Sequence, residues 1–345
     1  DTGEMICRYY DIREGGNFEG NSIPNLIHQS PEKFAEAQGI SVEAWQQQLK
    51  EARVKLFQHR DQRVHPHKDD KILTAWNGLM IAALAKGAKV LGKKAYREAA
   101  EKAVRFLLTH LRREEGRLLA RYRDGEASFP GYLDDYAFLI WGLHELYEAT
   151  WDTDYLRQAI HLNEEMLALF WDDERGGCYF TGSDSEQLLA RPKEIHDGAI
   201  PSGNSVTAYN LLRLAHLTGS SSLEEKAEQH IQAFAGRAEK APTGMAFFLT
   251  AIQLAIGPKS MIVVAGEAGD AMTEDMLTEA QRTFLPGALL LFHPHTKTRN
   301  DLEQLAPSVS EQNMQNGQAT AYICENYTCQ EPLNDVDRFR ERLKQ

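Results

Sequence analysis

A pair of helices recurs through the middle of the sequence, and this repeat limits the possible fold more than any other feature. Each pair has a short internal connection, and longer connections with extended runs at residues 117–123 and 177–181 separate the pairs. The helices are expected at residues 76–91 and 95–111, 134–150 and 154–171, and 205–217 and 222–236. Tyr155 lies 59 residues after Tyr96, and Leu223 lies 68 residues after Tyr155. Such a period predicts a stacked array of helical hairpins.

The helix expected at residues 134–150 has the clearest apolar face. Its apolar residues follow the three- and four-residue spacing of one side of a helix: Leu133, Tyr136, Ala137, Ile140, Leu143 and Tyr147. Small residues in the helix at 76–91 would let a neighbouring helix approach closely. We therefore expect these faces to form the core between the hairpins.

A polar stretch at residues 63–78 leads into the first hairpin. Pro66 ends the preceding helix, because proline lacks a backbone N–H donor and clashes with the turn before it. Thr74 is expected to cap the next helix. The stretch is either an ordinary helix-entry loop with a solvated face or a loop that carries functional groups on a rigid scaffold.

The two ends of the sequence have other patterns. Near the start we expect a short helix around residues 5–10 and another within 31–60, capped by Ser41. After Gly257 and Pro258, strands alternate with helices, which predicts a small α/β appendage. Its elements are expected at residues 261–265, 273–284, 288–293, 321–324 and 335–343, with a polar loop over 301–318.

The composition disfavours several classes of protein. A net charge of −12 over 345 residues disfavours non-specific nucleic-acid binding, which needs a basic surface. No apolar run is long enough to span a membrane. Four cysteines in a chain of this length do not suggest a disulfide scaffold. We expect a cytoplasmic protein with neither a nucleic-acid nor a membrane partner.

Four stretches of sequence carry a family resemblance. They are CRYYDIREGGNFEGNSIPNL at 7–26, KDDKILTAWNGLMIAALAKGAKVLG at 68–92, PKEIHDGAIPSGNSV at 192–206 and AYICENYTCQEP at 321–332. In this order they resemble the YyaL-like family, the relatives of spermatogenesis-associated protein 20. The resemblance covers essentially the whole chain.

The resemblance implies an architecture. Members of this family usually carry an N-terminal thioredoxin-like domain, followed by an α/α-toroid similar to six-hairpin glycosidases and sugar epimerases. This chain matches the later part of that plan and has no Cys-x-x-Cys motif. We therefore expect a mainly α fold, with an α/α-toroid segment at residues 1–257 and the α/β appendage at 258–345. The remaining hairpins and a covalently linked thioredoxin-like domain are expected upstream.

In a helical toroid the loops between hairpins gather at one end and surround a concave centre, where ligands bind. Three stretches, residues 65–77, 129–136 and 193–204, should therefore converge. Their candidate catalytic residues are Asp134, Asp135 and His196, and their candidate substrate-binding residues are His67, Asp70, Trp76, Asn77, Tyr136, Asp197 and Asn204. The same stretches contribute His65, Asp69, Glu194 and Ser202. Carboxylates, imidazoles and aromatic rings together suit sugar recognition and acid–base chemistry.

Each candidate has a structural alternative. Asp134 and Asp135 are either capping residues at a helix start or include a general acid tuned by its neighbour and by burial. His196 is either a proton-transfer group or a loop histidine bonded to backbone. The spacing of His65 and His67 is not a convincing zinc pattern, so neither a metal nor another cofactor is expected.

These residues favour a carbohydrate-active enzyme, a sugar epimerase, isomerase or hydrolase acting in the toroid centre. One alternative is a non-catalytic sugar-binding or redox-partner module that works with the thioredoxin-like domain. A purely structural scaffold is the third. One fold hosts many functions, so these three functions can be distinguished only by the residues and geometry of the site.

Two cysteines, Cys324 and Cys329, lie five residues apart near the end of the sequence. They could form a disulfide only if the chain turns back between them. Tyr322, Ile323 and Tyr327 favour an extended chain, whereas Asn326 favours a turn. We therefore expect two reduced thiols, with Cys324 buried and Cys329 nearer the surface.

Overall fold

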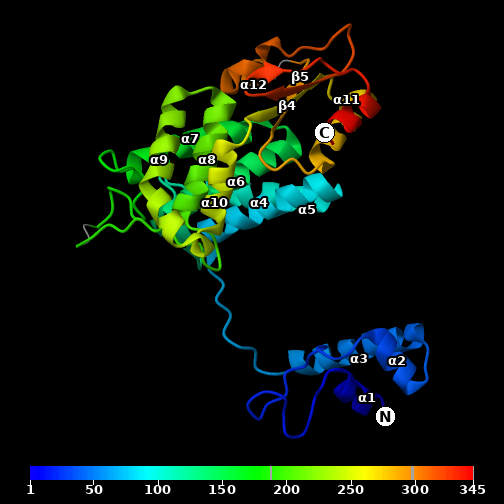
Figure 1. The fold of residues 1–345 in the computed structure, drawn as a ribbon. Coiled ribbons are helices and arrows are strands. Elements are labelled where there is room, and N and C mark those ends of the chain that lie inside the picture. The colour runs from blue at the N-terminus through cyan, green and yellow to red at the C-terminus, as the bar shows by residue number, and fades with distance from the viewer. Residues whose placement is uncertain (187–188, 297–298, 345) are drawn as a thin grey trace. The chain divides into compact units, whose positions relative to one another are not determined.

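The computed structural model describes residues 1–186, 189–296 and 299–344. Its contacts divide the chain into two compact units, Asp1–Asp70 and Lys71–Gln345 (Figure 1). No helix in the described ranges is long and apolar enough to cross a membrane. The assignment of residues 1–257 and 258–345 to separate domains stays a prediction.

Three helices build the first unit: α1 Thr2–Tyr9, α2 Pro31–Gln38 and α3 Val42–Asp61. The rings of Tyr9, Phe34 and Trp45 are buried at its centre, with 4.6 to 5.2 Å between ring centroids. The side chain of Ser41 accepts a hydrogen bond from Ala44 N, which confirms the predicted cap of α3. Aromatic packing therefore holds this small unit together.

The second unit contains the helical hairpins. Its inner helices, which contact one another in chain order, are α4 Thr74–Leu91, α6 Leu133–Thr150, α8 Gly203–Thr218 and α10 Ala246–Ile256. Its outer helices are α5 Lys94–His110, α7 Thr153–Phe170 and α9 Ser221–Lys240, and a short 3₁₀ turn, η1 Pro242–Gly244, joins α9 to α10. Figure 1 shows α6, α8 and α10 side by side. The predicted repeat of helical hairpins is confirmed.

The inner helices α4 and α6 approach each other at two glycines. A Cβ on Gly78 would lie 2.6 Å from the backbone carbon of Phe138, and a Cβ on Gly142 would lie 2.9 Å from Gly78 O. Real side chains do not approach so closely, so the two backbones pack directly against each other only because both residues are glycine. This contact sets the spacing at the centre of the array.

A three-stranded antiparallel sheet connects the starts of α4 and α6. Its strands, in the order β1-β2-β3, are β1 Ile72–Leu73, β2 Leu119–Arg123 and β3 Glu126–Pro130. The second extended run, predicted at residues 177–181, belongs to no strand of the described residues: Cys178 forms an isolated bridge with Trp171, and Phe180 N donates a hydrogen bond to Pro192 O. That part of the strand prediction is therefore wrong, because the segment finds no partner strand.

The predicted cap of α4 is also wrong. Thr74 is the first residue of the helix, and its hydroxyl donates a 2.6 Å hydrogen bond to Leu119 O. The backbone N–H of Ala75 instead donates a hydrogen bond to the carboxylate of Asp135, which belongs to another helix. A cap supplied by a distant side chain has no local signal in the sequence.

The C-terminal region forms the expected α/β appendage. Its elements are β4 Ser260–Gly266, α11 Ala271–Arg282, β5 Leu289–Pro294, α12 Arg299–Leu305, η2 Pro307–Glu311, β6 Thr320–Glu325, β7 Thr328–Cys329 and α13 Val336–Arg342. The sheet order is β5-β4-β6-β7, with β4 and β5 parallel and the other pairs antiparallel. Residues 301–318, predicted as a loop, contain most of α12 and all of η2, whose buried Leu302 and Val309 anchor them.

Both faces of the appendage sheet are covered. One face shares the hydrophobic core of the helical hairpins through Met261, Val263, Leu289, Leu291 and Cys324. The other packs under α11 and α13 through Ile262, Val264, Leu290 and Phe292. The alternation follows from the two-residue period of a strand. The predicted fold class is confirmed: a mainly α chain with an α/α-toroid segment and a small C-terminal α/β appendage.

Cys324 and Cys329 are joined by a disulfide, so the prediction of two reduced thiols is wrong. The two residues face each other in the register of β6 and β7, with 3.8 Å between their Cα atoms. Asn326 and Tyr327 both adopt left-handed backbone conformations, with φ of 48° and 65°, and turn the chain back within two residues. Because a tyrosine rarely adopts this conformation, Tyr327 was expected to favour an extended chain. The predicted burial is confirmed, because Cys324 is buried and Cys329 is exposed.

Candidate functional site

The starts of the inner helices bring several predicted residues together. Asp135, in the first turn of α6, is buried, and its carboxylate connects two helix starts. Oδ1 accepts a 2.8 Å hydrogen bond from Ala75 N, and Oδ2 accepts one of 2.7 Å from Tyr132 N. Burial raises the pKa of Asp135 to about 7, although the two N–H donors favour the charged form. Both oxygens therefore serve the backbone, as the capping interpretation expects.

Asp134 is the second carboxylate at this end of the array, and it is half-buried. Burial and the negative charge of Glu194 raise its pKa to about 6, against a hydrogen bond from the backbone of Gly203. A Cβ on Gly203 would lie 2.3 Å from Asp134 Oδ1, so only glycine fits beside this carboxylate. Asp134 can therefore exchange a proton near neutral pH, as a general acid or base must.

Exposed aromatic rings lie beside these carboxylates. Trp76 in the first turn of α4 is 62% exposed, and Tyr132 is 37% exposed. Tyr132 stacks on Phe180, with 5.0 Å between ring centroids and 13° between the ring planes. Since Asp135 binds both Tyr132 N and the residue before Trp76, the two exposed rings come from adjoining backbone positions. Flat rings with an apolar face and an open side can stack on a sugar.

Asn204 and Asp197 hold the surrounding loops in place. Asn204 is fully buried and exchanges two hydrogen bonds of 2.9 Å with the backbone of Cys178, and it donates a third, of 2.7 Å, to Glu194 O. Asp197 accepts from Ser202 N at 2.9 Å and from two backbone N–H groups at the start of α10. These contacts position the segment that carries Glu194. Their predicted binding to a substrate stays a prediction.

Tyr136 and Asn77 also make structural bonds. Tyr136 is fully buried, and its hydroxyl accepts hydrogen bonds of 3.0 Å from Leu118 N and 3.2 Å from Arg117 Nη1. Asn77 is half-buried and donates a 2.8 Å bond to Leu73 O, one turn earlier. Tyr136 therefore presents no surface to a ligand in this conformation.

His196 lies in the loop before α8, where its ring packs against Gly244. It is exposed and lines a cavity of about 580 Å³ together with Glu194, Lys193 and Arg237. Glu194 lines this cavity and also acts electrostatically on Asp134. This shared neighbour connects the predicted histidine to the predicted acid.

His67 and Asp70 belong to the first compact unit, and both are exposed. Their convergence with the residues of the second unit stays a prediction. Within the described ranges, no three His, Cys, Asp or Glu side chains form a group that could hold a metal ion.

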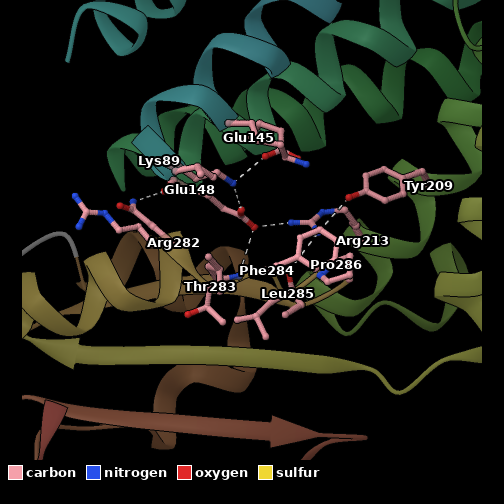
Figure 2. Close-up of a pocket in the computed structure, with 16 residues that line it drawn as sticks. Lys89, Glu145, Glu148, Tyr209, Arg213, Arg282, Thr283, Phe284, Leu285 and Pro286 are labelled. Atoms are coloured by element: carbon pink, nitrogen blue, oxygen red, sulfur yellow. Dashed lines mark hydrogen bonds and ion pairs between the residues drawn. The ribbon is translucent and has the colours of Figure 1, made fainter. Parts of the chain in front are cut away.

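A second polar cluster, at the other end of the inner helices, was missed by the sequence analysis. Lys89 Nζ lies 2.8 Å from Glu145 Oε2 and 2.5 Å from Glu148 Oε2, and Arg213 Nη2 lies 2.5 Å from Glu148 Oε1. Figure 2 shows Glu148 between Lys89 and Arg213, beside a cavity of about 210 Å³. Two glutamates three residues apart in the second half of a largely apolar helix were the available signal.

The chain was compared with known proteins. No family model matches it. Spermatogenesis-associated protein 20 of Homo sapiens is 32% identical over 361 residues, which cover 99% of this chain and 46% of that protein. The chain thus spans about half the length of the curated relatives it matches.

Two solved structures are similar to part of the chain. Cellobiose 2-epimerase from Bacillus thermoamylovorans is 16% identical, with a TM-score of 0.42 over 77% of this chain and 67% of that one. An α-mannanase from Bacteroides thetaiotaomicron is 16% identical, with a TM-score of 0.41 over 68% of this chain and 69% of that one.

Helical hairpins whose inner helices begin at one polar, aromatic-lined end place this chain in the class of α/α-toroid proteins. The sequence comparison extends over the whole chain. Over its whole length the chain is similar to spermatogenesis-associated protein 20 and its relatives, which confirms the resemblance carried by its four motifs.

Proposed function

We propose that this chain is a carbohydrate-active protein, a sugar epimerase, isomerase or hydrolase whose substrate binds where the inner helices begin. The observation that carries the proposal is Asp134, a half-buried carboxylate with a pKa raised to about 6. It lies at the end of the array where Trp76 and Tyr132 are exposed. A proton-exchanging carboxyl group beside rings that can stack on a sugar is the minimum that such a reaction needs.

Each residue then has a distinct role. Asp134 gives or takes the proton, and His196, on the cavity shared with Glu194, is the second proton-transfer group. Asp135 holds two helix starts and thereby positions Asp134. Trp76 and Tyr132 bind the sugar ring.

A thermal-shift screen against a library of mono- and disaccharides tests binding. A sugar that binds only the folded protein raises the melting temperature. Trp76→Ala should abolish this shift, and Phe57→Ala is the matched control, because it removes a comparably exposed ring, 56% against 62%, from the first unit. If no sugar stabilises the protein, or if both variants respond like the wild type, sugar binding at this end is refuted.

Catalysis is tested by incubating each stabilising sugar with the protein in D₂O and following it by NMR. An epimerase or isomerase that abstracts a carbon-bound proton exchanges it for deuterium, whereas a hydrolase releases a new reducing end. Asp134→Asn should lower the rate by roughly 10²–10⁴-fold while keeping the thermal shift, since it removes proton transfer and little volume. Binding without turnover would favour the non-catalytic sugar-binding alternative.

The disulfide supports a second candidate, the redox-partner module. Cys329 is exposed, so a thiolate of a thioredoxin-like domain could attack its sulfur, form a mixed disulfide with it and release Cys324 as a thiol. The second thiol of that domain then attacks the mixed disulfide, releases Cys329 as a thiol and leaves the domain with its own disulfide. Reduced thioredoxin should then generate two new thiols on the folded chain faster than dithiothreitol at equal concentration. Equal rates would refute this candidate. The double variant Cys324→Ser/Cys329→Ser is the control that should yield none.

A further inference from the structure

The buried charge cluster of Figure 2 has carboxylates that are fully supplied with donors. Glu148 accepts from Lys89 and Arg213, and its Oε1 also lies 3.4 Å from Leu290 N. Glu145 accepts from Lys89 through Oε2, and Oε1 lies 3.4 Å from both Lys86 Nζ and Trp141 Nε1. Each of the four carboxylate oxygens therefore has at least one donor.

The cations, by contrast, carry more N–H donors than the cluster has acceptors. Arg213 is 5% exposed, and its Nε makes no hydrogen bond within the described part of the chain. Its Nη1 has only long contacts of 3.4 Å, with Tyr209 Oη and Ala288 O. A guanidinium carries five N–H donors, and a buried donor without an acceptor is costly. The cluster thus lacks acceptors rather than donors.

Two further cations line the same cavity at its open side. Lys86 is 59% exposed at its side chain, and Arg282 is exposed as well. With Lys89 and Arg213, the lining holds four cationic side chains against two carboxylates. This local excess of positive charge stands out on a chain of net charge −12. A concave site of one sign attracts small ions of the other sign.

The size of the cavity limits the ligand. Its volume of about 210 Å³ is below the roughly 300–1,000 Å³ of pockets that take drug-sized molecules. A polysaccharide chain or a dinucleotide does not fit, whereas a phosphate or carboxylate group with a few attached atoms does.

We propose that this cavity binds a small oxyanion, the phosphate or carboxylate group of a small metabolite. Arg213 supplies donors at the floor, and Lys86 and Arg282 bind the anion at the entrance. The site is distinct from the proposed sugar site, because Asp134 and Glu148 are fourteen residues apart on α6, which corresponds to about 20 Å along the helix axis. The proposal therefore does not depend on the proposed carbohydrate activity.

The alternative is a cluster with a structural role alone. Gln281 donates a 2.7 Å hydrogen bond to Glu148 O, and Leu290 N approaches the carboxylate of the same glutamate. The cluster thus also ties the segment after α11 to the inner helices. A purely structural cluster needs no ligand, so it predicts no response to oxyanions beyond that to ionic strength.

The test is thermal unfolding of the full chain with inorganic phosphate, acetate or chloride at equal ionic strength. Phosphate or acetate should raise the melting temperature above the chloride value with a saturable concentration dependence, which a specific site requires and screening does not give. Acetate without phosphate would identify a carboxylate group as the ligand, and the reverse a phosphate group. Shifts equal to those in chloride overturn the proposal.

Variants at the entrance locate the site. Lys86→Gln with Arg282→Gln should weaken oxyanion binding roughly tenfold, because two favourable charges are lost at exposed positions where folding is little affected. Lys102→Gln on α5 is the matched control, an exposed lysine outside the cavity, and should bind like the wild type. An oxyanion effect that persists unchanged in the double variant refutes this site.

Discussion

Asp135 and Ala75, sixty residues apart in sequence, join two helices: Asp135 Oδ1 of α6 accepts a 2.8 Å hydrogen bond from Ala75 N of α4. Related contacts continue along the array, since the backbone of Gly203 bonds Asp134, and Asp197 bonds the start of α10. Carboxylates at the positive ends of helices are favourable electrostatically. This chain of contacts fixes the end of the array where we place the sugar.

Asp135→Asn should change how stability depends on pH. The carboxyl titrates near pH 7 in the native state, through burial, and near pH 3.8 when unfolded. Between these values only the native state holds the proton, so the free energy of unfolding falls as pH rises, by about 1.4 kcal/mol per pH unit, or roughly 4 kcal/mol in all. The asparagine does not titrate. Urea unfolding at pH 4, 5, 6 and 7 should therefore show the variant gaining stability relative to the wild type as pH rises.

At pH 4, where the native carboxyl is protonated, the two proteins should differ by less than about 1 kcal/mol, because a protonated carboxyl and an amide each keep one carbonyl oxygen as acceptor. Asp275→Asn, an exposed substitution on α11, is the control for the loss of one charge. A stability difference that does not vary with pH would mean that the pKa of Asp135 is not raised.

Gly78→Ala should prevent close packing of α4 on α6. The new Cβ would lie 2.6–2.9 Å from backbone atoms of Phe138 and Leu139, which cannot move independently of the helix. We expect a loss of about 3 kcal/mol or more, or failure to fold. Gly236→Ala in α9, where nothing lies within 4 Å of the new Cβ, should instead stabilise by roughly 0.5–1 kcal/mol. Chemical denaturation compares the two, and equal effects would contradict the close contact.

Lys89→Met should be far more costly than Lys86→Met, although both lysines bind Glu145 from the same helix. Lys89 is buried, and its removal leaves Glu148 with Arg213 alone and Glu145 with only the exposed Lys86 as cationic partners, so it should cost about 3–5 kcal/mol. Lys86 is 59% exposed, and its loss should cost less than about 1 kcal/mol. Similar losses for the two variants would show that the cluster is hydrated.

The ion pair between Lys89 and Glu145 should also make stability depend on pH. Burial would raise the pKa of Glu145, but the charges of Lys89, Lys86 and Arg213 and the hydrogen bond from Lys89 together outweigh burial and lower the pKa to about 2. This contribution to stability is present above the unfolded pKa of about 4.5 and is lost as pH falls toward 2. In Lys89→Met the buried carboxylates favour protonation, so the stability gap to the wild type should narrow between pH 7 and pH 4. A constant gap would contradict the pairing.

Thiol titration without reductant should separate the four cysteines. Cys7 is exposed and should react in the native protein, whereas Cys178 is buried and should react only after unfolding. Burial also raises the pKa of Cys178 to about 12, which slows its reaction further. Cys324 and Cys329 should react only after reduction. Four reactive thiols in the unfolded, unreduced protein would contradict the disulfide.

Local regularity explains which elements could be predicted. The apolar face of α6 repeats with the period of a helix, and the residues from Leu133 to Tyr147 on that face are almost fully buried. The cap of α3 by Ser41 depends only on neighbours in the sequence, and it is confirmed. The switch to strands after Pro258 is equally local. Elements whose stability comes from their own residues leave a readable pattern.

The predictions that failed depend on distant partners. Thr74 does not cap α4, since the carboxylate of Asp135 from another helix does. The turn at Asn326 and Tyr327 brings two cysteines together because the hairpin of β6 and β7 is anchored on β4. Tyr136 was expected at a ligand, but its hydroxyl satisfies a backbone N–H and Arg117.

The sequence by itself determined the helical hairpins, the α/β appendage and the family resemblance, because periodicity and motifs depend on residues close together in the sequence. The tertiary structure decided the chemistry. It gave Asp134 its raised pKa through Glu194 and burial, and it buried Lys89, Glu145, Glu148 and Arg213 in one cluster. Charge, burial and proton affinity depend on which groups meet in space, and those groups come from helices far apart in the chain.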